Sequence, residues 1–447
     1  MTDEKPKGRR AKRRPLTDLP PHYVGSFMEE PDGWDFMINK GIAEQGGEKG
    51  KPLPLASGVL GKGGWVVDRY QEYEDGRFVI HARCQLILVS CDCGSDNLIS
   101  YGTQTQTFHD MPHRMKPTTI VVPRQRLRCK DCGKTQFQYL PHMDSNHMMT
   151  HDLKSYIREQ SMKRTFTSIA EDVGIDERTV RRIFSAYADE LEQTHKIYTP
   201  EWLGIDEVHL TRQMRCVLTD VHARKPLDIL TDRNKPTVVR WLRDNMEPDK
   251  VKVVTMDMYT GYRNAVQEVL PNAKIVVDKF HVERAANIAL ETVRKRTHKT
   301  LSDYQRKQLK HDRKIMLMRR DALTDQQRFI LETWLGNFND LGQAYLLKEA
   351  FFDLYNFAAK HEAEMAFQVW IDDLNQQSDL IREAFSELTT FMHNWHDPIF
   401  NYFDVRATNA YTESLNGMLK QIYRNGQGYS FKAIRAKVLY GKIDHQR

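Results

Sequence analysis

The sequence predicts a multidomain α+β protein. We expect an N-terminal zinc ribbon-like β module, a helix-turn-helix, and an RNase H-like mixed α/β domain interrupted by an all-α insertion. Three observations predict this order: two close cysteine pairs after strand-like segments, a glycine turn between two short helical patterns, and three strand patterns followed by alternating helix and strand. The 447 residues suffice for about three domains.

Composition predicts a folded protein inside the cell. Hydrophobic residues make up 40% and charged residues 28% of the chain, and no apolar run approaches a membrane span. The basic segment Met1–Arg14 lacks the apolar core of a secretory signal. Six cysteines are too few for a disulfide scaffold of this length. We therefore expect a cytoplasmic location, and we expect the close cysteine pairs to bind metal rather than form disulfides.

Basic residues are spread along the chain, whose net charge is +6. Seven lysines and arginines crowd Met1–Arg14, which predicts a basic arm that lies on phosphates or, equally, a solubilising tail. Pro15–Gly64 is rich in glycine and proline and is expected to be loop. Further basic groups lie at 124–134, 178–182, 294–299, 306–320 and 420–442. Solvated helix faces explain any one group, but a long polyanion explains all of them together.

The first cysteine-containing region follows two predicted strands, Trp65–Tyr70 and Arg77–Leu88, joined by an Asp-Gly turn. Its second pair, Cys129 and Cys132, has the C-x-x-C-G form of a zinc knuckle. The first pair, Cys91 and Cys93, has the form C-x-C, which is one residue shorter than the usual C-x-x-C spacing. Alternative ligands are Cys84, His109 and His113, and ordinary free cysteines remain the other interpretation. Four thiolates leave no open position, so we expect structural zinc.

The segment His151–Gln193 has a helical pattern. Within Thr167–Ile183 a short helix, a glycine turn and a second, arginine-bearing helix follow one another, which is typical of a helix-turn-helix that presents a recognition helix to the major groove. A plain helical hairpin is the alternative. The candidate DNA-contacting residues of the second helix are Arg178, Thr179, Arg181 and Arg182.

The next segment predicts the RNase H-like sheet. Three strands joined by short connections are followed by helix, strand, helix and strand. The expected strands are 203–210, 216–221, 227–230, 251–257 and 273–278, and the expected helices are 236–245 and 262–270. From His281 to about His396 the pattern is helical throughout. Thr408–Ile443 is expected to form an amphipathic helix with Leu415, Met418, Leu419 and Ile422 on one side.

Three carboxylates are candidates for chemistry. Asp206 lies inside an apolar strand, Asp257 ends a strand expected beside it, and Glu413 opens the last helix. Acidic residues at strand ends are ordinarily turn or cap residues. Three of them crowded together repel one another, which magnesium or manganese would relieve. Two such ions in one site support phosphoryl transfer on nucleic acid. The chain has neither a Walker G-x-x-x-x-G-K-[ST] loop nor a G-x-S-x-G elbow.

Four motifs in this order resemble the DDE transposases of bacterial insertion sequences, and more narrowly the insertion-sequence-L-three family. They are LGIDE (203–207), MDMYTGY (256–262), VDKFHV (277–282) and TNAYTESLNGMLK (408–420). The resemblance covers about Trp65 to the C-terminus. It implies that Asp206, Asp257 and Glu413 bind the catalytic metal ions, that a zinc ribbon and a helix-turn-helix precede them, and that the helical stretch before Glu413 is an insertion domain.

The chain departs from this family in two ways. The C-x-C pair stands where the family has C-x-x-C, and the region before Trp65 is longer than the family pattern. The catalytic motifs show no gap, which favours an active enzyme over an inactive, domesticated descendant.

Other residues near the triad receive secondary roles. Glu207 should point to the opposite strand face from Asp206, which makes it a second choice for metal. Asp278 and His281 lie where a substrate phosphate should pass, although a capping or packing histidine is the alternative. Asn409 and Lys420 flank Glu413; Lys420 suits a phosphate contact or, as plausibly, is a solvated surface lysine.

We therefore expect a DNA transposase that binds double-stranded terminal inverted repeats and target DNA. Two magnesium (or manganese) ions would serve cleavage and strand transfer, and a homodimer or larger complex would pair the element ends. It would associate with the bacterial nucleoid when bound. The alternatives are a metal-dependent nuclease without strand transfer and a catalytically dead DNA-binding regulator. The expected divisions are arm and loop region 1–64, zinc ribbon-like domain 65–148, helix-turn-helix domain 149–197, catalytic domain 198–285 and 401–447, and helical insertion 286–400.

Overall fold

The computed structural model describes residues 65–85 and 90–441 and the backbone of 23–26. The chain forms two compact units, residues 1–193 and 194–447. The predicted basic N-terminal segment, Met1–Arg14, and most of the Gly/Pro-rich loop region lie outside the described residues. So do the last residues of the strand expected to reach Leu88 and of the helix expected to reach Ile443.

The first unit contains an eight-stranded sheet with the order β1-β2-β3-β5-β4-β8-β7, in which β6 also pairs with β5. Its strands are β1 (Tyr23–Ser26), β2 (Trp65–Glu72), β3 (Phe78–Cys84), β4 (Leu98–His113), β5 (Lys116–Cys129), β6 (Thr135–Phe137), β7 (Met143–Asp144) and β8 (Met149–Thr150). The predicted hairpin of β2 and β3 is confirmed, and Gly76 in its turn has φ +83°. The core contains Phe78, Ile80, Phe108 and Ile120.

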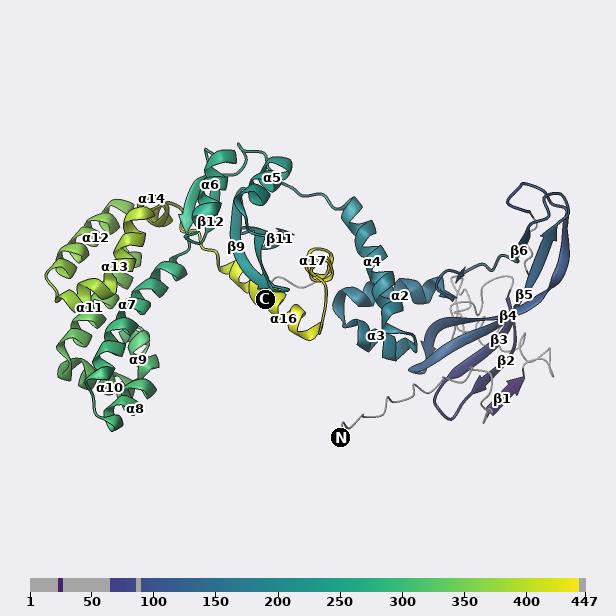
Figure 1. Ribbon diagram of the computed structural model, residues 1–447, viewed down its shortest axis with the longest axis horizontal. Coiled ribbons are helices and arrows are strands. Elements are labelled where there is room, and N and C mark those ends of the chain that lie inside the picture. Colours follow the sequence, from purple (N-terminus) through teal and green to yellow (C-terminus); the bar gives the residue numbers. More distant parts are fainter. Residues whose placement is uncertain (1–22, 27–64, 86–89, 442–447) are drawn as a thin grey trace, which may run out of the picture. The chain divides into compact units, whose positions relative to one another are not determined.

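The long hairpin of β4 and β5 was not expected from the sequence. Its strands run for 16 and 14 residues, antiparallel, between the two cysteine pairs. Only the part of β5 near Thr118–Val121 pairs with β3. Beyond that point β4 and β5 continue outward, and the strand that pairs with them there, among the described residues, is β6 (Figure 1). We call this outer part, residues 98–107, 121–129 and 135–137, the arm.

The helix-turn-helix follows the sheet and packs on the turn end of this hairpin. Its helices are α2 (His151–Lys163), α3 (Phe166–Val173) and α4 (Glu177–Thr194). The Thr165 hydroxyl caps α3, and Gly174 ends it in a left-handed conformation with φ +70°. A Cβ added at Gly174 would lie 2.6 Å from Cβ of Pro117 in β5, so glycine is required for both conformation and space.

The second unit contains the predicted mixed sheet, with the order β11-β10-β9-β12-β13. Its strands are β9 (Trp202–Leu210), β10 (Gln213–Asp220), β11 (Lys225–Ile229), β12 (Val253–Met256) and β13 (Lys274–Val277). The first three are antiparallel neighbours, whereas β12 runs parallel to both β9 and β13. The expected meander and the expected placement of β12 beside β9 are confirmed.

Helices cover both faces of this sheet. On one face, α5 (Lys235–Asn245) and α6 (Thr260–Val269) pack in a common core with Leu203 and Ile205 of β9. On the other, α16 (Ala410–Asn425) packs on β9 and β10, and α17 (Phe431–Tyr440) packs on β11. Because side chains alternate along a strand, Gly204 and Asp206 face α16 while Leu203 and Ile205 face α5 and α6.

An all-α segment separates β13 from α16, as predicted. It contains α7 (Lys279–Lys299), α8 (Asp303–His311), α9 (Arg313–Leu317), η1 (Arg320–Ala322), α10 (Asp325–Asn337), α11 (Asn339–Asp353), η2 (Leu354–Asn356), α12 (Lys360–Asn375), α13 (Asp379–Asn394), α14 (His396–Phe400) and α15 (Tyr402–Val405). Its core joins Val282 and Leu290 of α7 to Tyr345, Phe351 and Trp370. Since α7 begins at the sheet edge and crosses residue 285, the expected domain boundary there falls inside one continuous helix.

The single helix expected over Thr408–Ile443 was wrong, because the segment forms α16 and α17 with a turn between them. The turn contains Gln427 with φ +39° and Gly428 with φ +109°, which end the helical conformation. The Ser430 hydroxyl then caps α17 by accepting from the backbone N–H of Ala433.

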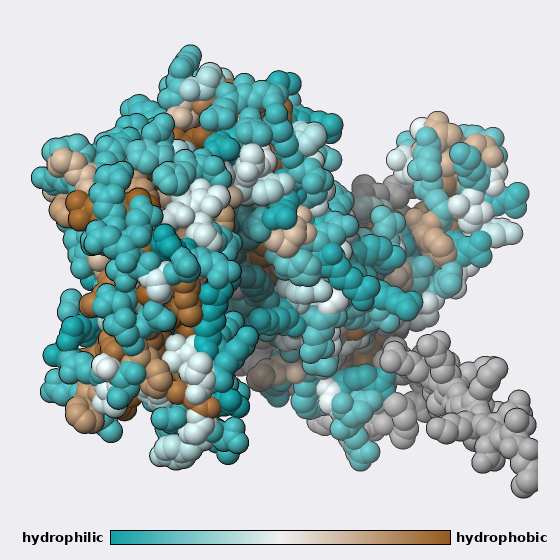
Figure 2. Space-filling view, turned by 60° about the vertical axis from the view of Figure 1, so that its left-hand side comes forward, coloured by the Kyte–Doolittle hydropathy of each residue, from teal (hydrophilic) through white to brown (hydrophobic). Residues whose placement is uncertain are grey.

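The surface drawn in Figure 2 is mostly hydrophilic, with scattered apolar patches. In the part of the chain that the structure describes, no helix combines the length and the apolar character needed to cross a bilayer.

Candidate active site and zinc centre

Acidic side chains from four elements meet where β12 and β13 end, beside the middle of β9 and the start of α16. Asp257 directly follows β12, whose Met256 pairs with Ile205 next to Asp206. Asp278 follows β13, and Glu413 lies in the first turn of α16. The site therefore combines residues that lie as much as 207 positions apart in the sequence (206 to 413).

Asp206 is almost completely buried, with 5% of its surface exposed. Its Oδ1 accepts a hydrogen bond from the backbone N–H of Glu207 (2.6 Å) and its Oδ2 accepts one from Nδ2 of Asn416 (2.7 Å). Burial and then the nearby charge of Asp257 raise the pKa of Asp206 to about 7. In the absence of a cation, this carboxyl group thus holds a proton more readily than an ordinary aspartate.

His281 lies in the first turn of α7, between two of the acids. Its Nε2 is 2.9 Å from Oδ1 of Asp257 and 3.6 Å from Oε1 of Glu413. Burial alone would lower the pKa of His281, but the adjacent Asp257 carboxylate outweighs burial and raises it. The N-cap of α7 is Asp278, whose Oδ1 accepts from the backbone N–H of Phe280, so His281 is not the capping residue.

The donor chemistry of this cluster fits a hard divalent cation. Ligand atoms of Asp278, His281 and Glu413 all lie within 4.8 Å of one another. The buried Oδ1 of Asp257 faces Nε2 of His281 at 2.9 Å. Burial and the charge of Glu413 raise the pKa of Asp278 to about 6, although the N–H of Phe280 opposes this. Such crowding of carboxylate oxygens is what a magnesium or manganese ion relieves.

Asn409 lies behind the acids rather than among them. It is fully buried; its Oδ1 accepts from Oγ1 of Thr255 (3.1 Å) and its Nδ2 donates to the carbonyl oxygen of Ile205 (3.3 Å). Asn409 thereby joins the start of α16 to both β12 and β9. Both ends of its amide are therefore used in contacts with the sheet.

Gly204 allows α16 to approach the sheet. A Cβ at this position would lie 2.4 Å from Oγ1 of Thr219 and 2.6 Å from Oγ1 of Thr412. These two hydroxyl groups are 2.8 Å apart and buried, and they link β10 to α16. The glycine in the LGIDE motif is therefore explained by the helix that carries Glu413.

The two cysteine pairs form one cluster in the first unit. Sγ of Cys91 lies 3.5 Å from Sγ of Cys132, and Sγ of Cys93 lies 3.8 Å from Sγ of Cys129. Tetrahedral zinc with bonds of about 2.3 Å separates its sulfurs by roughly 3.8 Å. Of the described residues, the cluster includes these four cysteines and none of the alternatives, Cys84, His109 and His113.

Two tight turns explain how a C-x-C pair completes this site. In the first, the N–H of Gly94 donates to the carbonyl of Cys91, three residues back; in the second, the N–H of Gly133 donates to that of Cys129, four residues back. The turn from Cys91 to Gly94 therefore has one residue fewer between its two cysteines than the turn from Cys129 to Gly133. Asp131 then joins the turns by accepting from Ser95 (2.5 Å) and Asn97 (3.2 Å).

The electrostatics of the cluster also favour a cation. Backbone N–H groups, first that of Cys132, lower the pKa of Cys129 to about 6. The N–H of Ser95 favours the thiolate of Cys93, but the neighbouring cysteines outweigh it and raise the pKa of Cys93 to about 12. Four thiolates at this spacing require a compensating cation, which a structural zinc ion supplies.

The recognition-helix residues differ in their surroundings. Arg178 and Arg182 are exposed one turn apart on α4. Arg181 is paired with Glu177 (2.7 Å) and lies over the Phe166 ring, and Thr179 is half-buried. Of the arginines of α4, Arg178 and Arg182 thus have no carboxylate partner among the described residues.

The chain is similar to known transposases over most of its length. The family model described as "Transposase", for the DDE transposases of the ISL3 type, matches residues 203–438, more than half of the chain. The chain belongs to the ISL3 family of transposases. The models described as "Helix-turn-helix domain of transposase family ISL3" and "zinc-finger of transposase IS204/IS1001/IS1096/IS1165" match residues 139–188 and 91–132.

A curated relative supports this assignment. The chain is 24% identical over 387 residues to the "Transposase for insertion sequence element IS1001" of Bordetella parapertussis, and the match covers 82% of this chain and 93% of the relative. Membership of the family implies a DNA-binding and DNA-processing enzyme. The expected family, the order of its domains and the helix-turn-helix are confirmed.

Two contacts at the site were not expected from the sequence. Asn416, three residues after Glu413, binds Asp206, and its own Oδ1 is buried without a hydrogen bond among the described residues. The spacing of three along α16 is the one signal that places Asn416 beside Glu413. Glu207, the second choice for metal, is instead paired with Arg233.

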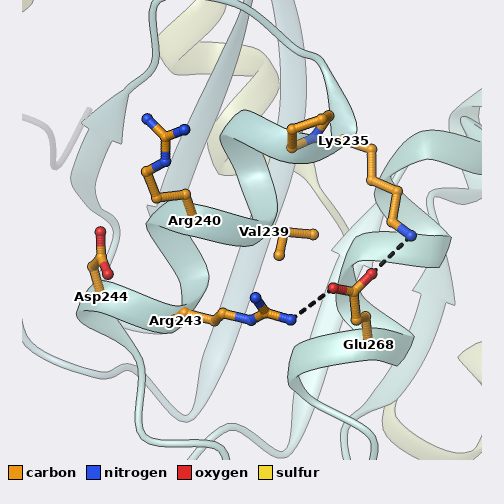
Figure 3. Close-up of a pocket in the computed structure, with 7 residues that line it drawn as sticks. Lys235, Val239, Arg240, Arg243, Asp244 and Glu268 are labelled. Carbon is orange, nitrogen blue, oxygen red and sulfur yellow. Dashed lines mark hydrogen bonds and ion pairs between the residues drawn. The ribbon is translucent and has the colours of Figure 1, made fainter.

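Two further surface features are the side chain of Lys420 and an open pocket on α5 and α6. Lys420 is exposed on α16. An open pocket of about 550 Å³ lies on α5 and α6, lined by Lys235, Pro236, Val239, Arg240, Arg243, Asp244 and Glu268. Figure 3 shows Glu268 between Lys235 (2.7 Å) and Arg243 (2.8 Å). None of the residues that line this pocket is a candidate catalytic residue.

Proposed function

We propose that this transposase cleaves DNA at the ends of its element and joins the freed ends to target DNA. We propose Asp206, Asp257 and Glu413 as the ligands of two magnesium (or manganese) ions, with Asp278 and His281 beside them. The observation that carries the proposal is the approach of Asp257 and Glu413 to the same atom, Nε2 of His281, at 2.9 and 3.6 Å. Asp206 lies on the neighbouring strand, close enough for the charges of both acids to raise its pKa.

The residues of the chain have distinct tasks in this proposal. Asn416 and the N–H of Glu207 orient Asp206. Asp278 fixes the first turn of α7, so that His281 stands between Asp257 and Glu413. In that position its imidazole can donate a hydrogen bond to a non-bridging phosphate oxygen. When bound, magnesium supplies Lewis acidity and a nucleophile of lowered pKa.

Recognition of the element ends is assigned to the first unit. Arg178 and Arg182 face solvent at the start of α4, where a recognition helix meets base edges. Thr179 and Arg181 have secondary roles, because Arg181 is already paired with Glu177. We also propose that Lys420 contacts a phosphate, and that two or more copies assemble, since two element ends require two sites.

The test is cleavage and joining of a labelled duplex that carries the element's end, with magnesium present. We compare wild type with Asp206→Asn, Asp257→Asn and Glu413→Gln, and use Asp249→Asn, an exposed loop aspartate, as matched control. Loss of several kcal/mol of transition-state stabilisation corresponds to roughly a 10³-fold slower reaction. Each triad variant should lose this activity and keep end binding, whereas the control should keep both.

Two outcomes would replace the proposal. If wild type cuts but never joins a pre-cut end, the protein is a nuclease without strand transfer. If wild type binds but never cuts, and Asp206→Asn changes nothing, it is a DNA-binding regulator.

A further inference from the structure

The outer face of the arm carries a row of alternating arginine and aromatic side chains. The guanidinium of Arg124 lies 5.2 Å from the Phe137 ring centroid, and that of Arg126 lies 5.8 Å from the same ring. Arg126 and Arg128 then lie 5.7 and 5.6 Å from the Tyr101 ring centroid. The order along the face is Arg124, Phe137, Arg126, Tyr101, Arg128, which we call the arginine row.

Strand register places the row on one side of the three strands. Arg126 pairs with Phe137 of β6, and Arg128 pairs with Ile99 of β4. Because side chains alternate, Leu127 and Cys129 point to the opposite side. Along β5 and β6 that side is covered: Leu127 is 6% exposed, and the carbonyl oxygens of Cys84 and Ser90 accept hydrogen bonds from Gln138 and Gln136.

The side with the row is open among the described residues. Tyr101 is 49% and Phe137 36% exposed, and Arg126 and Arg128 are exposed as well. Arg124 is the anchored end, since it donates to the carbonyl oxygen of Gln138 (2.6 Å). Exposed aromatic rings beside unshielded arginines are unusual for a face that meets only water.

The charges of Arg126 and Arg128 are not compensated locally. The arm's three segments contain no aspartate or glutamate. In the described part of the chain neither guanidinium has an ion pair or hydrogen bond with a carboxylate. The nearby Asp131 is bound to Ser95 and Asn97. Stacking on rings holds the arginines in place without neutralising them, so both remain ready for a polyanion.

We propose that this face of the arm is a second DNA-contacting surface, in which Arg126 and Arg128 bind the duplex of the terminal repeat. Arginine side chains on such a face can reach the phosphates and base edges of a duplex. The nine residue-to-residue steps along β5 from Pro117, where the helix-turn-helix packs, to Arg126 span roughly 30 Å. One turn of B-DNA is about 34 Å. The arm thus meets the duplex about one turn from the site of α4. The inference rests on the proposed function and extends its recognition surface.

The test measures binding of the full chain to the terminal-repeat duplex by fluorescence anisotropy over a salt series. We compare wild type with Arg126→Gln/Arg128→Gln. The control is Arg69→Gln/Arg224→Gln, which removes two other exposed arginines. Loss of two phosphate contacts should weaken binding about tenfold or more and flatten the log K against log salt slope by roughly 1.8. Hydroxyl-radical footprinting should lose protection about one turn from that of α4.

A second variant separates charge from folding. Arg126→Lys/Arg128→Lys keeps both charges, so it should keep the wild-type salt slope. If its slope flattens as much as that of the Gln variant, the loss comes from a distorted arm and the inference is wrong. Zinc content equal to wild type verifies that each variant is folded.

The inference and the proposed function fail in different ways. If wild type does not bind the terminal-repeat duplex, both fall. Suppose that wild type binds and that Arg178→Gln/Arg182→Gln abolishes binding. If Arg126→Gln/Arg128→Gln then matches wild type in affinity, salt slope and footprint, the inference about the arm is wrong and the proposed function stands.

Discussion

Nδ2 of Asn416 donates a 2.7 Å hydrogen bond to Oδ2 of Asp206 across 210 positions of sequence. The same amide nitrogen lies 3.2 Å from the carbonyl oxygen of Glu207. One side chain of α16 therefore orients a proposed metal ligand of β9. Asn416→Ala should leave Asp206 without this partner and reduce cleavage by about 10–100-fold, as removal of an outer-shell partner of a metal ligand generally does.

The measurement is the rate of end cleavage as a function of magnesium concentration. A positioning role predicts a higher magnesium requirement together with the lower rate. Ser414→Ala, on the exposed side of the same helix, should behave as wild type. An Asn416→Ala enzyme with unchanged rate and magnesium dependence would show that Asp206 is held by other contacts.

Gly204 offers a steric test of how α16 packs. Gly204→Ala places a Cβ against the hydroxyls of Thr219 and Thr412, and overpacking of this kind costs about 1–3 kcal/mol. We expect lower thermal stability and strongly reduced cleavage, with end binding by the first unit retained. Gly417→Ala is the control, because a Cβ there meets nothing within 4 Å and should be neutral or stabilising.

Removal of zinc should weaken binding of the terminal repeat, because the zinc cluster lies in the first unit and not among the acids of the second. Structural zinc sites contribute directly to folding. Cys132→Ser should therefore lose the bound zinc and most of the affinity for the terminal repeat, measured by metal analysis and anisotropy. Cys84→Ser, outside the cluster, should keep its zinc. Stoichiometric zinc in the Cys132→Ser protein would exclude the four-cysteine site.

The stability of the first unit should depend on pH through the carboxyl group of Asp144. Burial alone would raise the pKa of Asp144, but hydrogen bonds from Lys154 (2.5 Å) and His147 (3.1 Å) lower it well below its usual range. Its contribution is therefore present above the unfolded-state pKa of about 4 and is lost as the pH falls further. Asp144→Asn should destabilise the unit by about 1–3 kcal/mol at pH 7.

Urea unfolding checks this at several pH values. The difference between wild type and Asp144→Asn should be constant from pH 7 to 5 and shrink below about pH 4. Glu159→Gln, an exposed change on α2, should show no such trend. A difference that grows on acidification would contradict the assigned direction.

Sequence patterns predicted the second unit well because its strands are buried and apolar. Strand β12 lies between β9 and β13, so its four residues are all buried and the sequence shows an uninterrupted apolar run. That run, ending at Asp257, was enough to place Asp257 beside Asp206. The helical insertion was likewise visible from periodicity alone.

The long hairpin was missed for the opposite reason. The outer half of β4 is exposed on both sides, and its Thr103, Gln104, Thr105 and Gln106 carry no apolar signal. The contact of Asn416 with Asp206 was missed because nothing local in either segment encodes a partner 210 positions away. Only the packing of α16 on β9, which Gly204 permits, creates it.

The insertion between β13 and α16 delays completion of the acidic site during synthesis of the chain. Glu413 follows Asp206 by 207 positions, and at 5–20 residues per second the ribosome needs roughly 10–40 s to supply it. The first unit, residues 1–193, has left the ribosome long before. A nascent or prematurely terminated chain thus carries the helix-turn-helix and zinc cluster without the complete acidic site. In terms of the proposed function, such a fragment would occupy element ends and protect them from cutting.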